Sequence, residues 1–168
     1  MFLQVLATSN DFTFTVARLV LGVTFFMHGA QKMLGWFGGI GFHGSTSSFL
    51  QMGIPEPLAF LAICVEFFGG LALIVGLFTR IAALGIIADM LVAITKVHSD
   101  NGFFMNWSGT QKGEGFEYHL LAIALAIVLL IKGSGAFSVD EAIAWRWRKL
   151  RKPVGRWAIA GPKPSANA

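Results

Sequence analysis

Four long apolar runs divide the chain, and each is interpreted as a membrane-spanning helix. They cover about residues 12–34, 57–78, 81–97 and 116–131. A spanning helix needs about 20 mainly apolar residues. Stretches such as 120–131 do not alternate apolar and polar residues, as the strands of a membrane barrel would. The pattern therefore predicts an all-α membrane protein with a bundle of four transmembrane helices.

The composition and the ends of the runs agree with this interpretation. Hydrophobic residues make up 55% of the chain and charged residues 13%, whereas soluble domains carry about 25% charged residues. Ser9, Asn10 and Asp11 are good helix-capping residues before the first run, and Pro57 suits a helix start. We expect residues 1–138 to form a single transmembrane domain and residues 139–168 to form a basic, Trp-containing tail.

Basic residues predict the orientation of the spans. Three of them, Lys32, Lys96 and Lys112, fall on one side of the four-span arrangement. Nine fall on the side of both termini and the turn at residues 79–80: Arg80, Lys132, Arg146, Arg148, Lys149, Arg151, Lys152, Arg156 and Lys163. Because cytoplasmic loops carry an excess of Lys and Arg, we expect both termini in the cytoplasm.

Two further segments are expected to lie on membrane surfaces. Residues 45–53 predict a short interfacial helix in the outer loop, and the basic tail interleaves Trp with Arg and Lys as anionic lipid surfaces favour. The net charge of +4 is therefore interpreted as lipid contact and not as nucleic-acid binding. Glycines along the spans allow close helix packing, either within the chain or in a homo-oligomer.

Two carboxylates, Glu66 and Asp89, stand near the middle of their apolar runs. An ionisable residue at that depth marks a functional site by default, because it must face a partner or a wet cavity. A structural role is the alternative, since polar side chains also hold helices together in lipid.

Further polar residues are candidates for a shared pocket with these acids. They are Arg18, His28, Lys32, Lys96, Glu117 and His119. Arg18 is expected either to pair with one of the acids or to reach the lipid headgroups, and Lys32 and Lys96 are alternatively interfacial anchors. Asp89 and Lys96 share a face of a regular helix, whereas His98 is rotated about half a turn away and is expected at the mouth.

Familiar catalytic and metal-binding signatures are not seen in the sequence. Cys64 is the only cysteine, so neither an intrachain disulfide nor a cysteine-based metal site is expected. No phosphate-binding glycine loop, His-Glu-x-x-His or nucleophile elbow occurs. Catalytic residues cannot be assigned from these patterns.

The order and spacing of several short motifs resemble the DoxX family of small bacterial membrane proteins. These motifs are Arg18-Leu19 with Gly22, His28-Gly29 with Lys32, Glu66-x-x-Gly69-Gly70, Gly76-x-x-Thr79-Arg80, Glu114-Gly115-x-Glu117 and Ser138-Val139-Asp140. The resemblance implies a four-helix protein of the bacterial inner membrane. It also implies links to thiosulfate:quinone oxidoreductase subunits and to membrane redox complexes with other enzymes as partners.

The residues and the resemblance together favour a quinone as ligand. Cationic donors and proton-accepting acids beside an apolar wall suit a quinone head group, whose redox chemistry is coupled to proton transfer. The function expected is a quinone-binding subunit of a redox assembly. The alternatives are a non-enzymatic membrane scaffold or chaperone and a small-solute transporter. Haem ligated by His28 and His119 is the weaker cofactor hypothesis.

Overall fold

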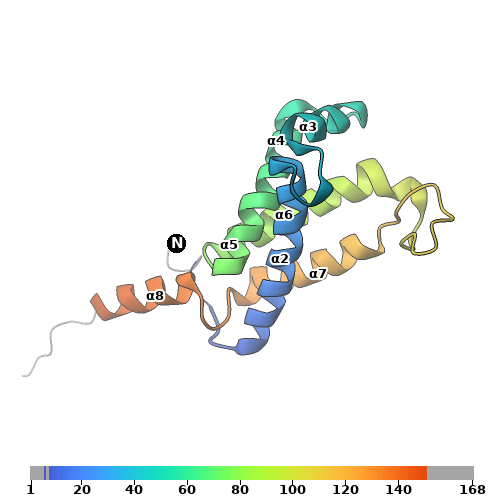
Figure 1. The fold of residues 1–168 in the computed structure, drawn as a ribbon. Coiled ribbons are helices and arrows are strands. Elements are labelled where there is room, and N and C mark those ends of the chain that lie inside the picture. Colours follow the sequence, from blue (N-terminus) through green and yellow to red (C-terminus); the bar gives the residue numbers. More distant parts are fainter. Residues whose placement is uncertain (1–5, 7, 151–168) are drawn as a thin grey trace, which may run out of the picture.

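The computed structural model describes residue 6 and residues 8–150 (Figure 1), and every regular element in this part of the chain is helical. The predicted tail from residue 151 onward lies outside the described residues. The elements are α2 (Phe12–Leu34), the 3-10 turn η1 (Trp36–Gly38), α3 (Gly41–Gln51), α4 (Glu56–Cys64), the π-turn η2 (Val65–Gly69), α5 (Gly70–Val75), α6 (Thr79–Ala93), the π-turn η3 (Ile94–His98), the 3-10 turn η4 (Ser99–Asn101), α7 (Glu117–Lys132) and α8 (Val139–Leu150).

Three helical segments of the described chain are long and apolar enough to cross a membrane. They are Phe12–Leu34, Glu56–Val75 and Thr79–Asn101, and the first coincides with the predicted run at 12–34. α7 occupies the fourth predicted run but has 16 residues, which corresponds to about 24 Å of helix against a hydrocarbon core of about 30 Å. The all-helical prediction is confirmed, with three candidate spans.

The turn between the second and third spans lies earlier than the predicted turn at residues 79–80. Gly76 has φ 72° and ends α5, and Phe78 has φ 49° before α6 begins at Thr79. Asp140 from the start of α8 accepts hydrogen bonds from the backbone N–H groups of Phe78 (2.7 Å) and Thr79 (3.0 Å). A side chain from the far end of the sequence therefore caps α6, which local patterns could not reveal.

Loss of this distant cap should destabilise the fold. Asp140 is buried; loss of a helix N-cap costs about 0.5–2 kcal/mol, and leaving buried N–H groups unpaired costs about 1–3 kcal/mol more. We expect Asp140→Ala to lower the free energy of unfolding in detergent by about 2–4 kcal/mol. Glu141→Ala, which changes the neighbouring acid on α8, is the control and should have little effect. Equal losses in both variants would contradict the capping role.

The helices form two antiparallel pairs that cross (Figure 1). α2 packs on α4, η2 and α5, and α6 packs along α7. We call the end where α2 begins the Arg18 end and the end where α2 finishes the Lys32 end. The buried core between the pairs consists of Leu21, Phe25, Leu73, Ala83, Ile86, Met90, Ala122, Ala126 and Leu129. Toward the Lys32 end the two pairs diverge (Figure 1).

α3 lies over the Lys32 end, where it packs on α2 and α4 (Figure 1). It contains most of the stretch 45–53 for which a short helix was predicted. Its placement at a membrane interface stays a prediction. α8 extends away from the bundle at the opposite end (Figure 1).

Candidate functional site

A cavity of about 670 Å³ fills the space between the diverging pairs. α2, the α4–η2 segment, the α6–η3 segment and the first turn of α7 all contribute to its wall. Its polar lining residues are His28, Lys32, Glu66, Asp89, His98, Glu114, Tyr118 and His119. The volume is within the range of about 300–1,000 Å³ that is typical of small-molecule sites.

Two π-turns place polar side chains on this wall. Glu66 belongs to η2, which interrupts the second span between α4 and α5, and His98 ends η3, which follows α6. A π-turn holds an additional residue and often occurs at functional sites, because it changes the direction in which neighbouring side chains project. Both π-turns thus lie at the cavity.

Lys32 and Glu66 form an ion pair across α2 and η2. Lys32 Nζ lies 2.6 Å from Glu66 Oε1 and 2.5 Å from Oε2. The Lys32 side chain is 28% exposed and that of Glu66 is 7% exposed. The pair satisfies the buried carboxylate and leaves the ammonium group partly accessible from the cavity.

Three buried polar atoms beside the cavity have no hydrogen-bond partner among the described residues. They are Asp89 Oδ2, the Tyr118 hydroxyl oxygen and His119 Nδ1. Buried polar groups are almost always paired, so an unpaired group needs an explanation such as a bound ligand or water. Since three such atoms come from residues that line one cavity, their arrangement fits a ligand with polar groups.

Two histidines meet near the outermost part of the cavity. The ring centroids of His98 and His119 are 4.1 Å apart, and His98 Nδ1 lies 2.7 Å from the backbone carbonyl oxygen of Glu114. A carbonyl oxygen only accepts, so Nδ1 of His98 carries a proton and donates it to this bond. In the neutral ring, Nε2 of His98 is therefore a hydrogen-bond acceptor.

The rest of the cavity wall is apolar. Leu58, Leu61, Ala62 and Val65 line it from the α4 side, and Gly85, Ala88, Val92, Ala93 and Val97 line it from the α6 side. The wall therefore combines charged and hydrogen-bonding groups from α2, η2, α6 and α7 with hydrocarbon from α4 and α6. Such a combination suits an amphipathic small molecule.

The structure brings five of the eight predicted site residues together. These are His28, Lys32, Glu66, Asp89 and His119, all of which line the cavity. Lys96 is exposed outside it, and Glu117 accepts a hydrogen bond from the backbone N–H of Met105 (3.3 Å).

Arg18, the eighth predicted residue, lies at the opposite end of the bundle from Lys32. Its guanidinium group pairs with neither acid of the cavity and instead donates to four backbone carbonyl oxygens. These belong to Leu73 (2.6 Å), Ile74 (2.7 Å), Ser134 (2.9 Å) and Phe137 (3.3 Å). The arrangement joins α2 to the end of α5 and to the segment between α7 and α8.

Tyr118 is a cavity residue that the sequence analysis did not select. It is the single tyrosine of the chain and lies in the first turn of α7, and its ring centroid is 6.3 Å from that of His28. The sequence feature that could have identified Tyr118 is its position next to His119 at the start of a predicted helix. Two other cavity residues, His98 and Glu114, were also not among the predicted site residues. His98 was expected at the mouth of the pocket, and Glu114 belongs to one of the motifs that resemble the DoxX family.

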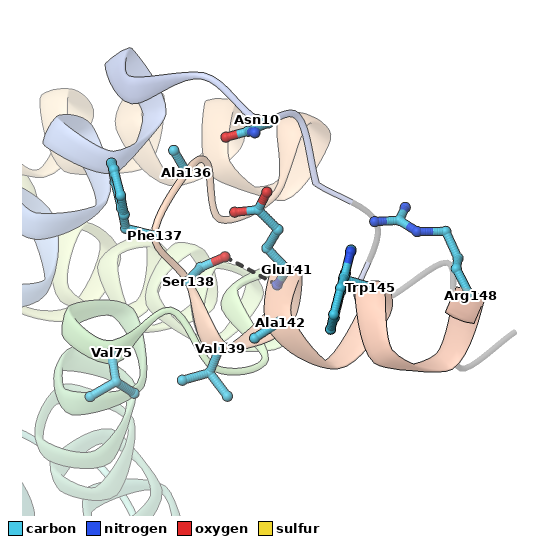
Figure 2. Close-up of a pocket in the computed structure, with 10 residues that line it drawn as sticks. All are labelled: Asn10, Val75, Ala136, Phe137, Ser138, Val139, Glu141, Ala142, Trp145 and Arg148. Carbon is cyan, nitrogen blue, oxygen red and sulfur yellow. Dashed lines mark hydrogen bonds between the residues drawn. The ribbon is translucent and has the colours of Figure 1, made fainter. Parts of the chain in front are cut away.

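A second, open cavity of about 610 Å³ lies where α8 leaves the bundle (Figure 2). Figure 2 shows Trp145 and Arg148 on α8, and the backbone N–H of Glu141 donates to the Ser138 hydroxyl (3.2 Å). None of the predicted site residues lines this cavity. Within the described residues, no cluster of three or more His, Cys, Asp or Glu side chains is arranged to hold a metal ion.

Apolar helices of spanning length around a cavity with polar lining residues define a multi-span membrane protein. The DoxX family profile matches residues 13–99, so the chain belongs to the DoxX family. The family predicted from the sequence motifs is thereby confirmed.

Curated relatives agree with this assignment. The chain is 29% identical to "Inner membrane protein YqjF" of Escherichia coli over 139 residues, which cover 82% of this chain and 97% of that protein. It is also 29% identical to "Putative oxidoreductase CatD" of Bacillus subtilis over 126 residues, which cover 75% of this chain and 83% of that protein. No solved structure matches the chain significantly.

Proposed function

We propose that this protein is an inner-membrane subunit of a redox assembly and that it binds a quinone in the cavity between the two helix pairs. The observation that carries the proposal is the composition of the cavity wall. The wall combines three unpaired polar atoms and a charged pair with a large hydrocarbon lining. A quinone likewise combines a polar ring with an apolar tail.

Five polar residues of the cavity have roles that their chemistry permits. The Tyr118 hydroxyl and the Lys32 ammonium group donate hydrogen bonds to the head-group oxygens. Asp89 and His119 hold or release protons beside them through Oδ2 and Nδ1. Glu66 keeps Lys32 oriented through their ion pair. A bound quinone would supply two-electron chemistry coupled to two protons.

The proposed topology has four crossings with both termini in the cytoplasm of a bacterial cell. α7 is the fourth crossing, because it packs along α6 and carries Tyr118 and His119 to the same cavity. The excess of basic residues at the Arg18 end supports a cytoplasmic location for that end. The name of the Bacillus relative, "Putative oxidoreductase CatD", supports a redox role.

The test is a binding titration with a ubiquinone that has one isoprene unit, performed on the purified full-length protein. Asp89→Asn removes a charge from the cavity wall and Tyr118→Phe removes a hydroxyl group, and both substitutions preserve the shape of the side chain. We expect each substitution to raise Kd about tenfold, which corresponds to about 1.4 kcal/mol.

Two other predicted site residues provide matched controls, because they lie outside the cavity. Glu117→Gln removes one acid and Lys96→Met removes one cation, and both are expected to leave Kd unchanged. An absence of binding by the wild-type protein would contradict the proposal. Copurification of an oxidoreductase with a protein that binds no quinone would favour the scaffold hypothesis.

A further inference from the structure

Two apolar stripes face each other across the cavity from α4 and α6. Leu58, Leu61, Ala62 and Val65 recur at helical spacing on the α4 side. Opposite them, the spacing from Gly85 through Ala88 to Val92 gives a second apolar stripe. Asp89 is the one ionisable residue of the α6 stripe, and it is partly buried.

The two stripes contact each other only at the ends that lie toward the Arg18 end of the bundle. Gly85 lies against Val65, since a Cβ placed on Gly85 would be 3.2 Å from Val65 Cγ1 and 3.3 Å from Cγ2. α6 packs on η2 and α5, but α4 is not among its main packing partners in the described chain. α4 and α6 separate toward the Lys32 end (Figure 1).

Side chains at this gap are exposed although they line the cavity. Leu58 is 50%, Leu61 56% and Val92 39% exposed. At the depth of a spanning helix, this exposed side faces lipid hydrocarbon. The cavity and the surrounding lipid are thus adjacent at the gap between α4 and α6.

Other segments of the chain line the cavity away from this gap. Phe49, Met52 and Ile54, from the end of α3 and the following turn, line it at the Lys32 end, where Met52 is 47% exposed. Met105 and the exposed Glu114 line it from the segment before α7. Toward the Arg18 end, the cavity is closed by the buried core that includes Phe25 and Met90.

We infer that the gap between α4 and α6 is a lateral opening through which a membrane-dissolved ligand enters the cavity. The polar head reaches the Lys32–Glu66 pair and Asp89, while a long hydrocarbon tail stays between Leu61 and Val92 and extends into the bilayer. This inference rests on the proposed function and names its substrate class, a long-tailed lipid quinone drawn from the membrane and not a water-soluble quinone.

The experiment measures the association rate of an isoprenoid quinone with eight isoprene units, using the full-length protein in lipid nanodiscs. Leu61→Trp and Val92→Trp narrow the gap and are expected to slow association at least tenfold. Leu84→Trp is the matched control, because Leu84 is 57% exposed on α6 but does not line the cavity. It should leave the rate unchanged.

Smaller substitutions keep the test decisive if a tryptophan variant does not fold. Leu61→Ala and Val92→Ala widen the gap and are expected to raise the association rate at least twofold. Unchanged rates in all gap variants, with normal wild-type binding, would overturn the lateral opening and leave the proposed function standing. A wild-type protein that binds neither the short nor the long quinone would overturn both.

Discussion

Replacing Arg18 by leucine is expected to lower the free energy of unfolding by about 3–5 kcal/mol, because buried carbonyl oxygens lose their charged donor. Arg18 is 1% exposed, and its guanidinium group donates to carbonyl oxygens of α5 and of the segment between α7 and α8. A buried polar group that loses its partner keeps the cost of its desolvation. The measurement is thermal and denaturant unfolding of the purified protein in mild detergent.

Two controls separate hydrogen bonding at Arg18 from charge alone. Arg18→Lys retains the charge but has fewer donors in a different geometry, so we expect a loss of stability smaller than that of the leucine variant. Arg148→Leu removes an exposed arginine of α8 and should have little effect. A leucine variant at position 18 that unfolds like the wild type would contradict the structural role.

Substitution of Gly29 is expected to separate α2 from η2 and to break the Lys32–Glu66 pair. A Cβ at position 29 would lie 2.3 Å from the backbone nitrogen of Phe67 and 2.6 Å from the carbonyl carbon of Glu66. Backbone atoms cannot rotate away as side chains do, so the helices themselves must move. We expect Gly29→Val to cost about 3 kcal/mol or more in unfolding free energy and to weaken quinone binding.

Gly69→Ala is the matched control for Gly29. A Cβ at position 69 would have its nearest neighbours at 4.0 Å, which is ordinary van der Waals contact. Both glycines belong to the same region of helix packing, but only Gly29 lies against the backbone of another segment. Similar unfolding midpoints for Gly29→Val and Gly69→Ala would show that close backbone approach at position 29 is unimportant.

The sequence predicted three of its four spans well, because apolar runs directly reflect burial in lipid, whereas the predicted run at 116–131 is not among the candidate spans of the described residues. The run at 12–34 coincides with α2. The end of the second span was predicted at residue 78, whereas the helix ends at Val75 because Gly76 adopts a left-handed conformation. The capping of α6 by Asp140 depends on a contact between residues far apart in sequence.

The depth of a polar residue was easier to predict than its partner. The mid-span positions of Glu66 and Asp89 suggested a shared polar space, and both line the cavity. Arg18 was expected to pair with an acid or to reach headgroups. Its actual partners are carbonyl oxygens at the end of α5 and after α7, and these groups come together only through the tertiary fold.

Helix phase explains why Lys96 lies outside the cavity while His98 lines it. A regular helix puts Lys96 on the face of Asp89 and His98 about half a turn away. The π-turn η3 spans Ile94–His98 and adds one residue to the helical repeat. Lys96 is consequently exposed, while Val97 and His98 line the cavity. Single-sequence patterns do not reveal such an insertion.

The π-turn η2 makes the site sensitive to the gain or loss of a single codon. Removing one residue from Val65–Gly69 would restore a regular α-helix and rotate one half of the span by about 100° relative to the other. A neighbour of Glu66 would then be presented to Lys32. A chain shortened by one residue here would therefore present a different side chain to Lys32 even though the residues on either side were unchanged.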